Sequence, residues 1–213
     1  MIDLAYAAHC LPVLLKGLVV TVEATLAGTA IALVLGLVWA LLGYVRSAVV
    51  RWPVRAVIEL VRSTPLLVQL YFLFYVLPDA GVVLSPLVTG MLGLGLHYSA
   101  YTAVVYRAGI NAVPRGQWDA AAVLGLSRAH TLRAIILPQA IAPMVPALGN
   151  YFIAMFKDTP MLSAITVLEL LQRAKLLGAA QFRYLEPLTL VGLLLLAVSL
   201  PASRLVARLE VRT

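Results

Sequence analysis

Five long apolar runs constrain the fold of this chain more than any other feature of its sequence. A membrane-spanning helix needs about 20 consecutive, predominantly apolar residues, and each run is long enough. Hydrophobic residues make up 62% of the 213 residues and charged residues only 12%, a balance that ordinary soluble domains do not have. The pattern predicts an all-α integral membrane protein with five transmembrane helices, at about residues 15–45, 54–77, 86–110, 135–156 and 185–205.

We interpret the whole chain, 1–213, as one membrane domain whose core covers about 15–205. Residues 1–12 are expected to form an outer, interfacial lead-in, because no basic residue precedes the first apolar run as it would in a signal peptide. Pro65 lies inside the second run and predicts a kink there. Residues 157–184 combine charges with apolar residues at helical spacing, which predicts a short helix at the outer face.

The basic residues predict the orientation, because membrane proteins concentrate Lys and Arg in their cytoplasmic loops. If the loop between the third and fourth runs is cytoplasmic, eleven of the 16 basic residues lie inside and five outside. This distribution predicts an outer N-terminus and an inner C-terminus. The inner set is Arg46, Arg51, Arg55, Arg62, Arg107, Arg115, Arg128, Arg133, Arg204, Arg208 and Arg212, and the outer set is Lys16, Lys157, Arg173, Lys175 and Arg183.

Several functions are excluded by what the sequence lacks. The chain has one cysteine, Cys10, which excludes an internal disulfide and a cysteine-rich metal site. It has no phosphate-binding Gly-x-x-x-x-Gly-Lys-[Ser/Thr] loop, so it should not bind ATP itself. It also has no arrangement of catalytic acids, bases or nucleophiles. The basic residues are scattered singly, so the net charge of +7 does not indicate nucleic-acid binding. We therefore expect no enzyme activity, metal or cofactor.

The predicted cytoplasmic loop, about 112–133, contains a short Ala-rich segment that ends at a glycine. Asp119 suits the positive N-terminal end of a helix, and Gly125 can take the left-handed conformation that ends one. With the Leu137-Pro138 pair downstream, this segment resembles the coupling loop of permease subunits in ABC importers, which docks on a cytoplasmic ATPase. The resemblance implies that coupling is carried by Gly116, Gln117, Asp119, Ala120, Ala121 and Gly125.

Further motifs are similar to the polar amino-acid branch of these permeases, the histidine/glutamine type. They occur in family order at 61–69, 100–110, 137–140 and 157–159. The resemblance implies a type I importer core of five helices in the bacterial inner membrane. It also implies three kinds of partner: a homodimer of ATPase subunits, a second permease subunit, and an extracytoplasmic solute-binding protein.

Two departures from the branch bear on the substrate. Many amino-acid members have a glutamate where this chain has Val104, and a serine where it has Pro160. The missing glutamate weakens an assignment to cationic amino acids. Details at 62–65, 96–98, 106–110 and 182–189 resemble the permease subunits of ectoine/hydroxyectoine importers. We therefore expect a small polar zwitterion, either ectoine or hydroxyectoine or a polar amino acid.

Uncharged polar and aromatic side chains near the middle of the predicted helices are candidates for the substrate pathway. An aromatic face can hold a delocalised cationic ring by cation–π attraction, although interhelical hydrogen bonding would also account for such residues. The alternative function is a proton-coupled secondary carrier or channel subunit, with His97 or Glu23 as the titrating group. Glu59 and Arg62 are expected to form a structural ion pair. The pathway candidates are His97, Tyr98, Tyr101, Asn150 and Gln69.

Overall fold

The computed structural model describes residues 3–210, which form helices joined by short turns and contain no strand. The α-helices are α1 (Leu4–Leu42), α2 (Ala48–Ser63), α3 (Leu66–Tyr71), α4 (Pro86–Ala112), α5 (Arg115–Val123), α6 (Arg128–His130), α7 (Leu137–Asp158), α8 (Leu170–Gln181) and α9 (Leu185–Glu210). Two π-helical turns, η1 (Phe72–Val76) and η3 (Thr131–Ile136), and two 3-10 turns, η2 (Leu77–Ala80) and η4 (Thr159–Ile165), extend or connect them.

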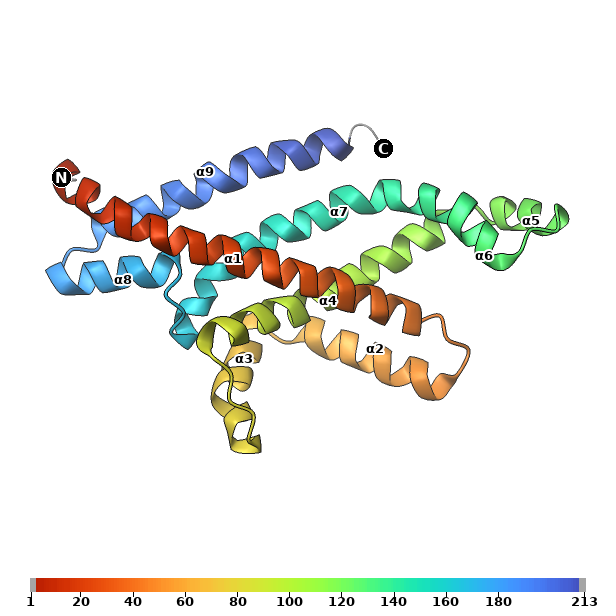
Figure 1. Ribbon diagram of the computed structural model, residues 1–213, viewed down its shortest axis with the longest axis horizontal. Helices are drawn as coiled ribbons and strands as arrows, with labels where there is room; N and C mark the ends of the chain where they lie inside the picture. The colour runs from red at the N-terminus through yellow and green to blue at the C-terminus, as the bar shows by residue number, and fades with distance from the viewer. Residues whose placement is uncertain (1–2, 211–213) are drawn as a thin grey trace.

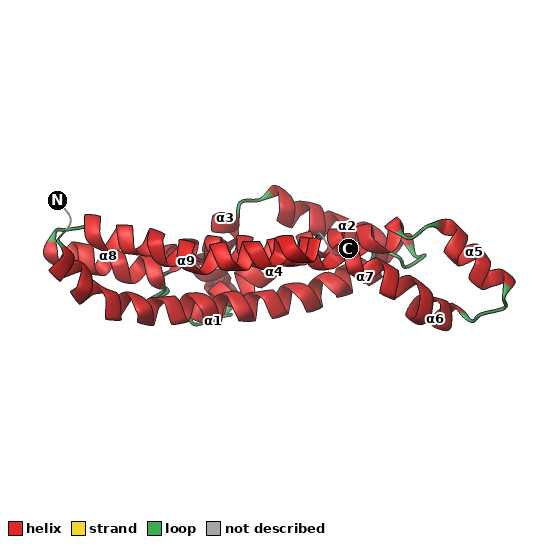
Figure 2. Cartoon of the chain, turned by 90° about the horizontal axis from the view of Figure 1, so that it is seen from above, coloured by secondary structure: helices red, strands yellow, loops and turns green. Residues whose placement is uncertain are grey.

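The long helices α1, α4, α7 and α9 run roughly along the long axis of the molecule (Figure 1). The short helices α5 and α6 form a hairpin that extends beyond one end, and α8 and the start of α1 lie at the other end. Figure 2 shows the same arrangement from above, as a long and narrow bundle. We refer to the two ends as the α5 end and the α8 end. The segment that begins with α3 projects sideways from the bundle (Figure 1).

The tightest contact in the bundle is the crossing of α1 and α4, which depends on small residues. A side chain at Gly36 would meet the Thr102 hydroxyl, and a Cβ at Gly95 would lie 2.5 Å from Cγ2 of Ile31. The close approach lets Thr102 Oγ1 donate a 2.8 Å hydrogen bond to the carbonyl of Ala32. Small residues at every fourth position are typical of membrane helix packing. On α1 these buried residues are Gly28, Ala32, Gly36 and Ala40.

The second apolar run is not one kinked helix, as the sequence suggested, but two helical segments. α2 and the stretch 66–80 meet at an angle of 107°. Proline disfavours a helical conformation in the residue before it, and Thr64 is accordingly extended, with φ −108° and ψ 138°. Pro65 therefore breaks the span completely.

The number of membrane spans agrees only in part with the five predicted. By length and apolar composition, three continuous helical stretches within residues 3–210 can cross a membrane, and the bent pair adds a fourth. α4 has 27 residues, about 40 Å at 1.5 Å per residue, but polar residues interrupt its apolar character. The count of five and the orientation therefore stay predictions. The three continuous stretches are Leu4–Leu42, Arg128–Ile165 and Leu185–Leu209.

The first helix begins at Leu4, much earlier than predicted, so the described residues of the expected lead-in at 1–12 belong to α1, and their interfacial location stays a prediction. Asp3 caps α1, since its side chain accepts hydrogen bonds from the backbone N–H groups of Ala5 and Tyr6. Arg183 forms ion pairs with Asp3 at 3.2 Å and with Glu186 at 2.6 Å. These contacts join the starts of α1 and α9 at the α8 end.

The short helix predicted within 157–184 is present as α8. The fully buried side chain of Glu169 begins it by accepting hydrogen bonds from the N–H groups of Leu171 and Gln172, at 2.8 and 2.7 Å. The N–H of Leu170, the first residue of the helix, donates instead to Thr21 Oγ1 on α1 at 3.2 Å. α8 is therefore fixed against α1 by its first residues.

Candidate coupling and translocation sites

The predicted coupling segment contains the helix α5, whose last helical residue is Val123 and whose C-terminal cap is completed by Gly125, as expected. Gly125 has a φ of +67°, a conformation that costs other residues free energy. Its N–H donates to the carbonyl of Ala122 and the N–H of Leu126 donates to that of Ala121, both at 3.0 Å. This pair of bonds is the Schellman arrangement, which satisfies carbonyls left free at a helix end.

Asp119 does not lie at the N-terminal end of the helix, where we expected it. α5 begins at Arg115 and has no acidic residue in its first turn, so Asp119 lies in the second turn, beyond the strongest part of the helix dipole. Ala121 is buried, with 1% of its surface exposed. The other five predicted coupling residues are exposed: Gly116, Gln117, Asp119, Ala120 and Gly125.

The exposed C-terminal end of α5 is apolar. Val123 is 87% exposed and Leu124 is 73% exposed, although both lie outside the long apolar helices. Gln139 Nε2 near the start of α7 donates a 3.4 Å hydrogen bond to Gln117 Oε1. α5 therefore exposes apolar side chains at its C-terminal end and is hydrogen-bonded to α7 through Gln117.

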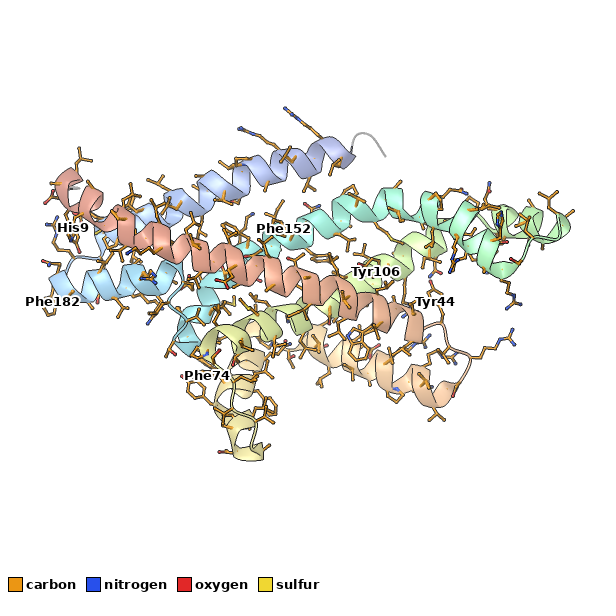
Figure 3. All side chains as sticks on the ribbon, viewed as in Figure 1. His9, Tyr44, Phe74, Tyr106, Phe152 and Phe182 are labelled. Carbon is orange, nitrogen blue, oxygen red and sulfur yellow. The ribbon has the colours of Figure 1, made fainter. Side chains whose placement is uncertain are left out.

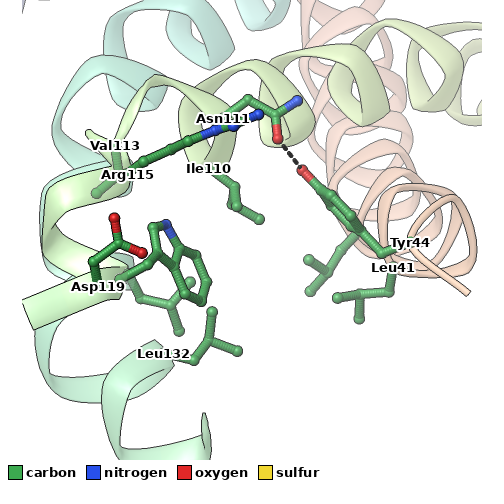
Figure 4. Close-up of a pocket in the computed structure, with 11 residues that line it drawn as sticks. Leu41, Tyr44, Ile110, Asn111, Val113, Arg115, Asp119 and Leu132 are labelled. Carbon is green, nitrogen blue, oxygen red and sulfur yellow. Dashed lines mark hydrogen bonds between the residues drawn. The ribbon is translucent and has the colours of Figure 1, made fainter. Parts of the chain in front are cut away.

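A cleft of about 990 Å³ lies beside α5 at the α5 end. Its walls come from the end of α1, the end of α4, α5 and the turn that leads into α7. Figure 4 shows Tyr44 and Asn111 on one side of the cleft and Asp119 on the other. Tyr44 lies near this end of the molecule and Phe182 near the opposite end (Figure 3).

A second group of polar side chains surrounds the break between α2 and α3. In a continuous helix the carbonyl of Val61 would accept from the N–H of residue 65, but Pro65 has none. The side-chain amide of Gln69 takes that place, with Nε2 2.8 Å from the carbonyl oxygen of Val61. The same nitrogen lies 3.1 Å from the carbonyl oxygen of Thr64 and 2.7 Å from its hydroxyl. Gln69 thus stabilises the break.

Gln69 also orients His97. Its Oε1 lies 3.2 Å from Nδ1 of His97 on α4. Because the amide nitrogen of Gln69 faces the carbonyl groups, its oxygen must accept, and Nδ1 must carry the proton. Nε2 of the neutral imidazole is then left as an acceptor. The His97 ring is packed against Tyr98 and Tyr101, with centroids 5.4 and 5.2 Å away.

The cluster continues from α4 to α7 and α2. Tyr101 lies 5.5 Å from the ring of Tyr151, and the Tyr98 hydroxyl donates a 2.7 Å hydrogen bond to Asp158 Oδ2. The guanidinium carbon of Arg62 lies 5.4 Å from the centre of the Tyr101 ring, within the range of cation–π attraction. The result is an aromatic surface with an exposed arginine at its edge.

The structure thus brings together four of the five pathway candidates, His97, Tyr98, Tyr101 and Gln69. Asn150 is exposed and makes none of these contacts. The expected ion pair between Glu59 and Arg62 is absent, because no salt bridge within residues 3–210 joins them.

Sequence reasoning missed three members of the cluster. Arg62 was assigned to the ion pair, and Tyr151 and Asp158 were not singled out as pathway residues. The signal for Tyr151 was its place beside Asn150. Asp158 lies in the motif 157–159, whose resemblance carried no role for this residue.

Among the described residues, no three His, Cys, Asp or Glu side chains are close enough to hold a metal ion. Glu23, the other titrating group considered for a proton-coupled carrier, is exposed on α1.

Comparison with known proteins identifies the class. Residues 9–213 match the family described as binding-protein-dependent transport system inner membrane component. A probable amino-acid ABC transporter permease of Sinorhizobium fredii, y4tG, is 47% identical over 98% of this chain and 90% of its own length. The glutamate/aspartate import permease GltK of Escherichia coli is 32% identical over 95% of this chain and 94% of its own.

Solved structures show the same fold. The crystal structure of an amino acid ABC transporter with histidines matches with a TM-score of 0.94, at 33% identity and over the whole of both chains. The inward-facing MetNI methionine ABC transporter matches with a TM-score of 0.73 at 20% identity, over 92% of this chain and 96% of the other.

These matches define a multi-pass permease of the inner membrane. The chain belongs to the family of binding-protein-dependent transport system inner membrane components, as the permease subunit of an ABC importer. It is a transport subunit and not an enzyme, and the family description implies a binding protein and an ATPase as partners. This membership decides against the alternative of a proton-coupled carrier.

Proposed function

We propose that this chain translocates a small zwitterion of the polar amino-acid class across the inner membrane, and that the cluster around His97 lines the pathway. The observation that carries the proposal is the joining of His97, Tyr101 and Arg62 beside the helix break at Pro65. Membrane proteins tolerate interrupted helices and polar side chains where these face protein or a water-filled cavity. The relatives' names, which include amino-acid permeases and a glutamate/aspartate permease, support the class.

The cluster offers two kinds of contact to a zwitterion. The guanidinium of Arg62 can pair with a carboxylate, and the rings of Tyr101 and Tyr151 can hold a cationic or delocalised group by cation–π attraction. Val104 brings no carboxylate to α4, and the one carboxylate of the cluster, Asp158, is balanced by the positive charge of Arg62, so the cluster has little net Coulombic preference for a cationic side chain. Within the class we therefore propose ectoine or hydroxyectoine ahead of common amino acids.

We further propose that the two ATPase subunits act through α5 and that a second permease subunit completes the pathway. In this scheme α5 carries the coupling residues and moves as a body when the ATPase dimer closes on ATP. The apolar groups at Val123 and Leu124 support it, because their exposure suits a protein partner. The hydrogen bond from Gln139 to Gln117 would transmit the movement to α7.

Uptake in cells that carry or lack this gene tests the substrate. Labelled ectoine, glutamine, histidine and arginine are supplied in parallel. We expect deletion to abolish ectoine uptake, and Arg62→Gln and Tyr101→Ala to reduce it at least about tenfold at normal membrane levels of the protein. Tyr71→Ala, on α3 outside the cluster, is the matched control. Loss of glutamine, histidine or arginine uptake with unchanged ectoine uptake would contradict the ectoine assignment alone.

A further inference from the structure

The cleft beside α5 has a size and a lining that suit a bound ligand in addition to the predicted ATPase contact. Leu37 and Leu41 from the end of α1, with Ile110, Leu132 and Leu137 opposite, make its walls apolar. Leu37 is 45% exposed and Leu41 is 53% exposed. A cleft of about 990 Å³ is at the upper end of the size range of small-molecule sites.

The rim of the cleft is polar and carries positive charge. Arg115 lines it, together with Tyr44 and Asn111, whose side chains are joined by a 2.9 Å hydrogen bond from the tyrosine hydroxyl to Oδ1 (Figure 4). The guanidinium carbon of Arg107 lies 6.0 Å from the Tyr44 ring centre. Asp119 is the acid in the lining, but no salt bridge among the described residues joins it to either arginine.

Arg107 lacks the partners that its charge requires. Its Nε is buried and has no hydrogen-bond acceptor within the part of the chain that the structure describes. Buried donors without partners are rare in native proteins and point to a missing water, ion or ligand. A rim ligand cannot reach this enclosed nitrogen, but Arg107 as a whole is only partly buried, lies beside Tyr44 and pairs with no carboxylate among the described residues, so the outer part of its guanidinium is available to an oxyanion at the rim.

We propose that this cleft binds an anionic phospholipid, with an acyl chain against the leucine walls and the phosphate at Arg107 and Arg115. The cleft lies where α1 and α4 end, at Leu42 and Ala112, which is the depth of the lipid headgroups if α4 spans the membrane as the sequence predicts. Trp118 and Tyr44, also in the lining, are residue types enriched at that depth. Clusters of basic residues there attract anionic lipids. The proposed orientation of the chain decides which leaflet supplies the lipid, and the binding site is the same in either orientation.

A lipid in this position would contact both the end of α1 and the coupling helix α5. It would therefore affect how far α5 can move relative to the bundle. Such a lipid is a structural ligand of the permease and makes no contact with the cluster around His97, so its loss should be separable from loss of substrate binding.

Native mass spectrometry of the purified permease–ATPase complex tests the proposal, with phosphatidylglycerol and phosphatidylcholine of identical acyl chains as probes. We expect each permease chain to retain phosphatidylglycerol about tenfold more tightly. Arg107→Gln/Arg115→Gln should abolish that preference, and Arg107→Lys/Arg115→Lys should keep most of it. The matched control is Arg55→Gln/Arg204→Gln, which removes two exposed arginines elsewhere and should change retention less than twofold.

A second arm tests the apolar walls without changing charge. Leu41→Trp narrows the cleft and should release phosphatidylglycerol, whereas Leu200→Trp, at a similarly exposed leucine on α9, should not. Three results would overturn the proposal: equal retention of the two lipids, retention that survives the glutamine replacements, or exclusion of lipid whenever the ATPase is bound. The last result would assign the cleft to the ATPase interface. None of the three would affect the proposed substrate.

Discussion

The phenol of Tyr98 donates a 2.7 Å hydrogen bond to Oδ2 of Asp158 and so joins the middle of α4 to the last residue of α7. Tyr98 is only 5% exposed, so this bond is shielded from competing water. Hydrogen bonds to charged groups contribute about 1.5–3 kcal/mol to stability. The bond fixes the relative positions of two helices whose aromatic residues form the proposed pathway.

We expect Tyr98→Phe to lower the stability of the complex by about 1–3 kcal/mol, because it leaves the Asp158 carboxylate without this donor. Thermal unfolding in detergent measures the effect. Tyr151→Phe is the control, since it removes a phenolic hydroxyl from the same cluster but not this bond. In a double-mutant cycle, Tyr98→Phe and Asp158→Asn should show a coupling free energy above about 0.5 kcal/mol. Additive effects would show that the bond does not contribute.

The crossing of α1 and α4 predicts that an alanine substitution destabilises the protein far more at one glycine than at another. Gly36→Ala should destabilise the protein by about 1–3 kcal/mol through overpacking, because the added methyl group meets the Thr102 side chain and lies 2.9 Å from the carbonyl oxygen of Ser99. Gly192→Ala on α9 adds the same methyl group where no heavy atom lies within 4 Å. It should be neutral or stabilising. Equal unfolding temperatures of the two variants would refute the proposed packing.

Coupling through α5 predicts loss of transport without loss of insertion. Gly125→Trp puts a bulky side chain at a φ of +67°, and Asp119→Lys reverses the charge on the exposed surface of the helix. Both should abolish uptake while the protein reaches the membrane in normal amounts. Uptake and immunoblots of membrane fractions measure the two quantities. Gly81→Trp, at a glycine of φ +83° with no atoms nearby, controls for backbone strain at an exposed turn far from α5.

Much of the architecture was predictable from the sequence because lipid sets the length of apolar helices. The predicted third and fifth helices, at 86–110 and 185–205, differ from α4 and α9 by only a few residues. The glycine that ends α5 was also predictable, since Gly125 follows a continuous helical pattern. These features depend on local composition and need no knowledge of the tertiary contacts.

The features that were not predictable depend on contacts between distant residues. A proline can kink a helix or break it, and the break at Pro65 is stabilised by Gln69 from the next helix. Asn150 and Tyr151 are adjacent, but a step of one residue turns a helix by about 100°. The sequence could not decide which of them faces the cluster, and Tyr151 does.

The cap of α8 predicts a pH dependence of stability. Burial raises the pKa of Glu169 to about 7, although hydrogen bonds from Leu171 and Gln172 oppose the shift. Because the folded protein binds this proton more tightly than the unfolded chain, stability should fall as the pH rises from about 4.5 to 7. We expect a loss of roughly 1–3 kcal/mol over this range, measured by unfolding between pH 5 and 8. Glu169→Gln should flatten this part of the profile, and Glu59→Gln, at an exposed glutamate, should not.

The orientation of the chain can be tested at the two ends of the bundle. In a Cys10→Ser background, a cysteine at Ala80 should react with a membrane-impermeant maleimide in intact cells. Residues 78–85 join the second and third predicted helices, lie outside in the predicted orientation and include no Lys or Arg. A cysteine at Arg128, beside α5, should react only after the membrane is permeabilised. Both positions are exposed in the single chain, and reaction at 128 after permeabilisation would show that the site is reachable, so its failure to react in intact cells would report the membrane barrier and not burial or coverage by a partner. Labelling in the reverse pattern would place α5 outside the cell, where it could not contact an ATPase, and would overturn the coupling proposal together with the topology.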